Sequence, residues 1–258
     1  HYYNFLALYL SSTWKTLKTQ GNYNNDIGLP LTLLQLDESY QVAVVEMGMG
    51  ALGEIQRLAA IARPQFALIS NVEHVHLETL GSLENIARAK CEVLSEIPED
   101  GFALINGDNK LLIETAREYS CRKYTFGYNG DCDFQAANCT VSDTGMKIDM
   151  RWHNQLETLF FPLPAQRLAL NIVAAAALAL LLGIDMKSIK NSLLNYKPSG
   201  NRLNIISLEN GGAVINDTYN ANQLSMAAAL ETSQELAGSG KYAAVLGDMF
   251  ELGSLETE

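Results

Sequence analysis

Apolar residues in the first part of the chain form short continuous runs, and stretches with helical spacing separate these runs. The runs at 42–45, 66–70 and 102–106 contain few polar side chains, which is typical of strands buried on both faces of a parallel sheet. Between them, 53–62 and 83–97 repeat apolar residues at the spacing of amphipathic helices. This alternation predicts an α/β fold with a doubly wound, mostly parallel sheet.

The remaining pattern predicts elements on both sides of this central block. Residues 122–162 change to short polar-apolar stretches, which favour a small antiparallel patch. A linker is expected at 197–202 and a strand pair around the turn at 209–212. Further helices are predicted at 2–12, 29–36, 168–183, 186–195 and 223–236, and further strands at 14–19 and 242–246. We therefore divide the chain into a first domain at 1–198 and a second unit at 199–258.

The composition of the chain argues against some classes of binding partner and some environments. The 258 residues carry a formal net charge of −11, which argues against a nucleic-acid backbone or an anionic membrane as the main partner. The apolar run at 168–184 contains Asn171 and is short for a bilayer span, so we expect a buried helix. The four cysteines show no C-x-x-C pairing, so we expect reduced thiols in a cytosolic protein.

Lys90 is the most unusual charged position in the pattern. It projects from the middle of the apolar face predicted for 83–97, and an unpaired buried charge is costly. One interpretation is a lysine that extends to the rim of the core or pairs with a structural carboxylate. The other is a functional lysine that has a specific partner or a chemical modification.

Polar side chains also follow the predicted parallel strands. Glu46, Asn71 and Asn106 lie at the carboxyl ends of three strands, where open α/β sheets bind ligands. Glu46 and His76 are chemically suitable for a divalent cation. The sequence contains neither a zinc-type spacing nor the G-x-x-x-x-G-K-[ST] phosphate loop. From the residues alone we predict a metal- or phosphate-assisted enzyme domain.

Several longer stretches resemble the Mur ligases, the ATP-dependent amide ligases of peptidoglycan synthesis. The similarity covers nearly the whole chain in the family's order, and is strongest to members that join D-Ala-D-Ala to UDP-MurNAc-tripeptide. It implies the family's central ATPase domain, which is similar to P-loop NTPases, followed by the start of a Rossmann-like C-terminal domain. The matching stretches are 21–32, 45–48, 76–78, 81–84, 89–90, 106–109, 217–222, 246–249 and 251–253.

The resemblance implies a role for each matching polar residue. Glu46 and His76 would lie at the second Mg²⁺ site, and Lys90 would carry CO₂ as a carbamate that supports this metal site. ATP would be held by Asn171, Arg202 and Asp217. The nucleotide-sugar peptide and the site between the domains would involve Asn22, Asn24, Tyr219, Asn220 and Asn222. The resemblance also implies a monomeric enzyme of the bacterial cytoplasm that uses ATP and Mg²⁺.

Some positions depart from the family's pattern and leave other interpretations open. We expect His1 to follow directly after the family's phosphate loop, so this stretch alone would be inactive. The usual G-x-H-N-x-x-N corresponds to 165–171 and retains only Asn171, while Glu73 stands where glycine is common. The alternatives are a non-catalytic binding domain of the same fold, and a related ligase that adds a single amino acid or glutamate.

Overall fold

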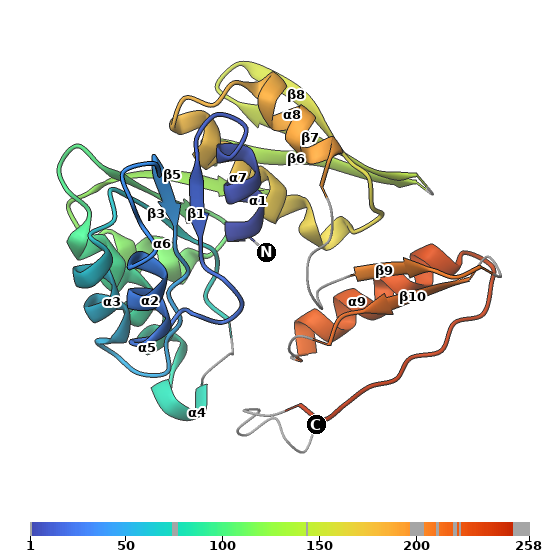
Figure 1. Ribbon diagram of the computed structural model, residues 1–258, viewed down its shortest axis with the longest axis horizontal. Coiled ribbons are helices and arrows are strands. Elements are labelled where there is room, and N and C mark those ends of the chain that lie inside the picture. The colour runs from blue at the N-terminus through green and yellow to red at the C-terminus, as the bar shows by residue number, and fades with distance from the viewer. Residues whose placement is uncertain are drawn as a thin grey trace.

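The computed structural model describes residues 2–73, 77–142, 144–196, 204–209, 212–218, 221 and 223–249. Its main sheet has six strands in the order β3-β4-β5-β6-β7-β8, and helices pack on both faces (Figure 1). Neighbours are parallel from β3 to β6 and antiparallel from β6 to β8. The strands are β3 (Phe66–Ile69), β4 (Phe102–Asn106), β5 (Arg122–Gly127), β6 (Phe134–Ser142), β7 (Gly145–Trp152) and β8 (Gln155–Phe161).

Strand β4 shows why the parallel part of the sheet has continuous apolar runs. All five of its residues are buried. Phe102 and Leu104 belong to the core that contains α1 (Tyr2–Leu10), whereas Ala103 and Ile105 belong to a second core on the opposite face. Because successive side chains of a strand point to opposite faces, both faces of β4 must be apolar. The predicted doubly wound sheet is confirmed.

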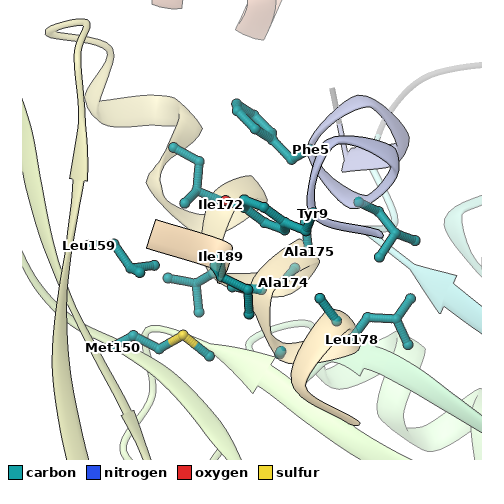
Figure 2. Packing of buried hydrophobic residues seen from close by; sticks show 14 of the residues in the cluster. Phe5, Tyr9, Met150, Leu159, Ile172, Ala174, Ala175, Leu178 and Ile189 are labelled. Atoms are coloured by element: carbon teal, nitrogen blue, oxygen red, sulfur yellow. The ribbon is translucent and has the colours of Figure 1, made fainter. Parts of the chain in front are cut away.

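The larger core lies between α1 and α7 (Ala169–Leu181) (Figure 2). Phe5 and Tyr9 of α1 are fully buried beside the alanine-rich helix α7. The small alanine side chains allow the helices to approach closely, while α8 (Met186–Leu194) and strands β7 and β8 close the other side. The predicted assignment of 168–184 as a buried helix is therefore correct, and no helix in the described part of the chain is long and apolar enough to cross a bilayer.

The second core is built by helices on the opposite face of the parallel strands. They are α3 (Glu54–Ala62), α5 (Leu83–Cys91) and α6 (Lys110–Ala116). The predicted helix at 83–97 is wrong in one respect, because it changes after Cys91 to a 3-10 helix, η1 (Glu92–Glu96). The short helix α2 (Gly28–Leu33) contacts α3, and α4 (Leu77–Leu80) contacts α5. The 3-10 helix η2 (Gln166–Leu168) instead leads into α7 and contributes Leu168 to the larger core.

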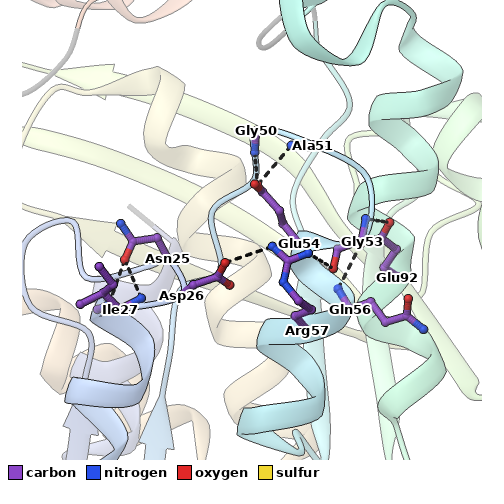
Figure 3. Close-up of polar contacts among 11 residues, drawn as sticks. Asn25, Asp26, Ile27, Gly50, Ala51, Gly53, Glu54, Gln56, Arg57 and Glu92 are labelled. Carbon is purple, nitrogen blue, oxygen red and sulfur yellow. Dashed lines mark hydrogen bonds and ion pairs between the residues drawn. The ribbon is translucent and has the colours of Figure 1, made fainter.

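A carboxylate from η1 holds the beginning of α3 (Figure 3). Gly53, the N-cap residue of α3, has a φ of 85° and no side chain that could accept a hydrogen bond. The Glu92 carboxylate accepts instead from the amide of Gly53 at 2.6 Å and from that of Gln56 at 3.1 Å. This contact between two elements satisfies amides that a helix N-terminus otherwise leaves unpaired.

Two predictions about strands need correction. Strand β2 (Val42–Val44) does not join the six-stranded sheet in the part described. It pairs in parallel with β1 (Thr16–Lys18) as a separate two-stranded ribbon. The antiparallel patch begins at β6 rather than at residue 122, because β5 continues the parallel sheet.

The carboxyl-terminal unit contains a short antiparallel strand pair and one helix. Strands β9 (Asn204–Ser207) and β10 (Ala213–Asn216) pair beside α9 (Gln223–Ala237), as predicted (Figure 1). The strand predicted at 242–246 is wrong, since 241–249 form neither helix nor strand. Val245 is 99% exposed, and a strand requires a neighbour for its hydrogen bonds. The predicted linker at 197–202 lies outside the described residues.

Candidate active site

A cleft of about 1530 Å³ opens at the carboxyl ends of β2 and β3. Seven residues that the sequence analysis selected line it, although they come from distant parts of the sequence: Asn24, Glu46, Asn71, Lys90, Asn106, Asn171 and Asp217. Polar groups at the carboxyl edge of a parallel α/β sheet form the usual ligand site of such folds. The tertiary structure therefore brings predicted metal, nucleotide and substrate residues to one cavity.

Glu46 is held at the end of β2 through its main chain. Its amide donates to Oγ1 of the buried Thr19 at 2.9 Å. Two residues later, the amide of Gly48 donates to the carbonyl oxygen of Asn24 at 2.7 Å. A Cβ at Gly48 would lie 3.0 Å from the Asn24 side chain, so glycine permits this close approach. The predicted substrate residue Asn24 is thus fixed next to the predicted metal ligand.

The side chain of Glu46 fits a cation. Its Oε2 atom is buried and has no hydrogen-bond partner within the described structure. A buried carboxylate oxygen without a donor is costly, and oxygen ligands are those that Mg²⁺ prefers. Across the described residues, no group of three or more His, Cys, Asp or Glu could hold a metal by itself. A Mg²⁺ ion here would need ligands from water or substrate as well.

Lys90 reaches the same cleft from helix α5. The helix begins after Ser82, whose hydroxyl accepts from the amide of Asn85 at 3.2 Å. The Nζ of Lys90 donates to the main-chain oxygen of Asn71 at 2.6 Å. Burial lowers the pKa of Lys90, and the charge of Glu73 opposes part of that decrease. In the structure, Lys90 is therefore paired with a main-chain carbonyl just after β3, and the Glu73 carboxylate lies nearby.

One predicted residue in the described part of the chain lies outside the cleft, and the structure does not test five others. Asn22 is exposed and does not line the cleft. Five others lie outside the described residues, so their predicted roles stay predictions: His76, Arg202, Tyr219, Asn220 and Asn222.

The cleft also contains charged and aromatic residues to which the sequence analysis gave no role. Arg167 lines it and makes two hydrogen bonds of 2.7 Å to the Glu231 carboxylate of α9. Tyr2 lines it as well, and burial raises the pKa of its hydroxyl. Arg167 could have been noticed as a basic residue four positions before Asn171, one helical turn away. No sequence signal distinguished Tyr2 from an ordinary core aromatic residue.

The fold and cleft define a ligand-binding α/β domain of the class that binds at the carboxyl edge of a parallel sheet. Residues 3–179 match the Mur ligase middle domain. Residues 201–258 match the Mur ligase, glutamate ligase domain. The chain belongs to the Mur ligase family.

Individual relatives agree with this assignment. The UDP-N-acetylmuramoyl-tripeptide–D-alanyl-D-alanine ligase of Bacillus subtilis is 39% identical over 247 residues, which are 96% of this chain and 53% of the relative. A crystal structure of MurF from Acinetobacter baumannii has a TM-score of 0.82 at 30% identity, over 91% of this chain and 51% of its own.

MurF from Thermotoga maritima in complex with ADP has a TM-score of 0.80 at 26% identity, over 91% and 54% of the two chains. The chain thus spans about half the length of the relatives that it matches.

Proposed function

We propose that the protein is an ATP-dependent ligase that joins D-Ala-D-Ala to UDP-MurNAc-tripeptide in peptidoglycan precursor synthesis. The observation that carries the proposal is the 39% identity over 96% of this chain to a relative with that name. The convergence of Glu46, Lys90 and Asn171 on one cleft supports it independently. We further propose a monomer of the bacterial cytoplasm, where ATP is available.

The proposed reaction has two steps. The terminal carboxylate of the tripeptide attacks the γ-phosphorus of ATP, so that ADP leaves and an acyl phosphate forms. The amine of D-Ala-D-Ala then attacks the acyl carbon, phosphate leaves and the amine loses a proton. A bound Mg²⁺ ion would neutralise the charge on the phosphates.

The described residues would position these reactants. The Glu46 carboxylate, with its unpartnered Oε2, would hold a cation at the end of β2. Asn171, half-buried in the first turn of α7, would contact the nucleotide base, and Asp217 would approach ATP from the C-terminal unit. The relative from Thermotoga maritima, whose structure is a complex with ADP, supports the binding of an adenine nucleotide.

We propose that Lys90 acts as a carbamate. Its lowered pKa favours the neutral amine, which is the form that can attack CO₂. The N–C bond would form with loss of one proton, and the resulting anion would support a cation near Glu46. His76 would complete this group, as the family resemblance implies.

The decisive experiment is phosphate release from ATP by the full-length protein with UDP-MurNAc-tripeptide, with and without D-Ala-D-Ala. Release that depends on the dipeptide would support both the reaction and its acceptor. Release with a single amino acid instead would favour a related ligase. A folded, Mg²⁺-supplied protein that releases no phosphate with any acceptor would favour a non-catalytic binding domain.

A further inference from the structure

Two neighbouring loops at the cleft are joined by one side chain, that of Asn109. Strands β3 and β4 are parallel neighbours with Ile69 opposite Ile105. The residues that follow them therefore emerge at the same edge of the sheet. Asn71 follows β3, and Asn109 follows β4 and caps α6.

The side-chain amide of Asn109 makes three hydrogen bonds, and both of its N–H donors are used. Its Oδ1 accepts from the amide of Leu112 at 2.9 Å, which caps α6. Its Nδ2 donates to Oδ1 of Asn71 at 2.7 Å and to the carbonyl oxygen of Val72 at 3.0 Å. One side chain thus anchors the loop after β3 to the rigid start of a helix.

The anchored loop is the part of the cleft that contacts Lys90. The main-chain oxygen of Asn71 accepts from Nζ of Lys90 at 2.6 Å. The Nδ2 of Asn71 donates to Oε1 of Glu73 at 2.6 Å. Asn71 therefore connects Asn109 to both charged groups, and all four residues are only half exposed or less.

We propose that Asn109 is a positioning residue of the active site, which fixes the loop 71–73 and through it the Lys90 amine and the Glu73 carboxylate. This inference rests on the proposed function, because it assigns Lys90 to the reacting region. Asn109 itself does not line the cleft. Its effect on the reaction would be exerted through Asn71.

Replacement of Asn109 by aspartate separates capping from anchoring. Aspartate caps a helix as well as asparagine does, so α6 keeps its N-cap. Nδ2, with its two N–H donors, is replaced by one carboxylate oxygen that faces the acceptor atoms of Asn71 and Val72, and this opposes the loop contact. In the full-length protein we expect Asn109→Asp to lower kcat about tenfold or more, since small displacements of reacting groups are costly.

Three further readouts distinguish positioning from general destabilisation. The KM for ATP should stay within about twofold and the melting temperature within a few degrees, as expected when the N-cap is retained. Deuterium uptake of the backbone at 70–73 should become faster. Asp185→Ala is the matched control, because Asp185 caps α8 with a 2.9 Å bond to Ser188 and lies outside the cleft. It should lower the melting temperature without a selective loss of kcat.

A kcat for Asn109→Asp equal to that of the wild type would overturn the proposal. The proposal would also be overturned if Asn109→Asp lost kcat only in proportion to its loss of melting temperature, to the same extent as Asp185→Ala. If the wild-type protein releases no phosphate, the proposed function is contradicted, and deuterium uptake alone then tests the anchoring role of Asn109. Unchanged deuterium uptake at 70–73 in Asn109→Asp would then contradict the anchoring role. Faster uptake would support the anchoring of this loop by Asn109, whether or not the protein is a ligase.

Discussion

At the scale of single residues, the structure explains how Lys90 can lie on an apolar helix face. The sequence places a lysine on an apolar helix face, and the structure gives its Nζ a carbonyl acceptor at 2.6 Å. Burial lowers the pKa of Lys90, and the negative charge of Glu73 opposes part of that decrease. The amine is therefore held by a hydrogen bond at the edge of the core, where it lines the cleft.

We predict that Lys90→Ala lowers the turnover of the full-length protein by roughly 10- to 100-fold, the range for residues that support a metal site. Added bicarbonate should not restore turnover, since the alanine cannot form a carbamate. Lys110→Ala is the control, because Lys110 is exposed and lies outside the cleft. Steady-state phosphate release provides the measurement, and near-wild-type turnover of Lys90→Ala would exclude the carbamate role.

Cys91, the next residue, gives a prediction about pH. It is fully buried, and burial raises the pKa of its thiol from 9.0 to about 12. The unfolded state loses the thiol proton at lower pH than the folded state. The contribution to stability is therefore complete below about pH 9 and decreases as pH rises towards 12.

We predict that the unfolding free energy falls less steeply above pH 9 in Cys91→Ala than in the wild type, even though the variant is less stable overall. Denaturant unfolding at several pH values between 7 and 10.5 measures this. Parallel pH profiles of the two proteins would show that the thiol does not contribute.

At the scale of elements, helix α3 depends on a residue that is distant in sequence. Gly53, the N-cap residue, has a left-handed conformation that favours glycine, but it has no side chain that could accept a hydrogen bond from the first helical amides. Glu92 supplies the acceptor, and its negative charge also interacts favourably with the helix N-terminus. The beginning of α3 is therefore held by a side chain of η1 and not by a residue of its own helix.

We predict that Glu92→Ala destabilises the protein by about 0.5–2 kcal/mol, the usual range for loss of an N-terminal cap. Glu99→Ala is the matched control, because Glu99 is exposed just beyond η1. Thermal or denaturant unfolding of both variants measures the difference. Equal stabilities would mean that water satisfies the amides of Gly53 and Gln56 equally well.

At the scale of the whole molecule, an ion pair joins the two parts of the chain. Arg167, before α7, makes a bidentate contact of 2.7 Å with Glu231 of α9. The two side chains are 45% and 54% exposed, so salt and water screen the pair. We expect it to orient α9 beside the cleft more than to stabilise the fold.

We predict that Glu231→Gln increases amide exchange in α9 at low salt and leaves the buried strand β4 unchanged. The difference should disappear near 1 M salt, where the screening length is about 3 Å. Glu235→Gln is the control on the same helix, because burial and then repulsion by Glu231 raise the pKa of Glu235, which is not the partner of Arg167. An effect that persists at high salt would point to packing rather than charge.

The sequence by itself determined the elements and the chemistry available to them. Continuous apolar runs predicted the parallel strands, because a strand covered on both faces has no position for a polar side chain. Glu46 and Asn71 could be selected because ligands bind at the carboxyl ends of parallel strands. Lys90 could be selected because an unpaired charge on an apolar helix face is costly. Local spacing contains this information, since it depends only on neighbours along the chain.

Only the tertiary structure decided which residues meet. The separation of β2 from the main sheet, the cap from Glu92 to α3, the anchor from Asn109 to Asn71 and the contact of Arg167 with Glu231 all join residues that are distant in sequence. The strand predicted at 242–246 fails for the same reason, because strand formation depends on a partner that local pattern cannot supply. Such contacts follow from packing and register between elements, which a single sequence pattern does not specify.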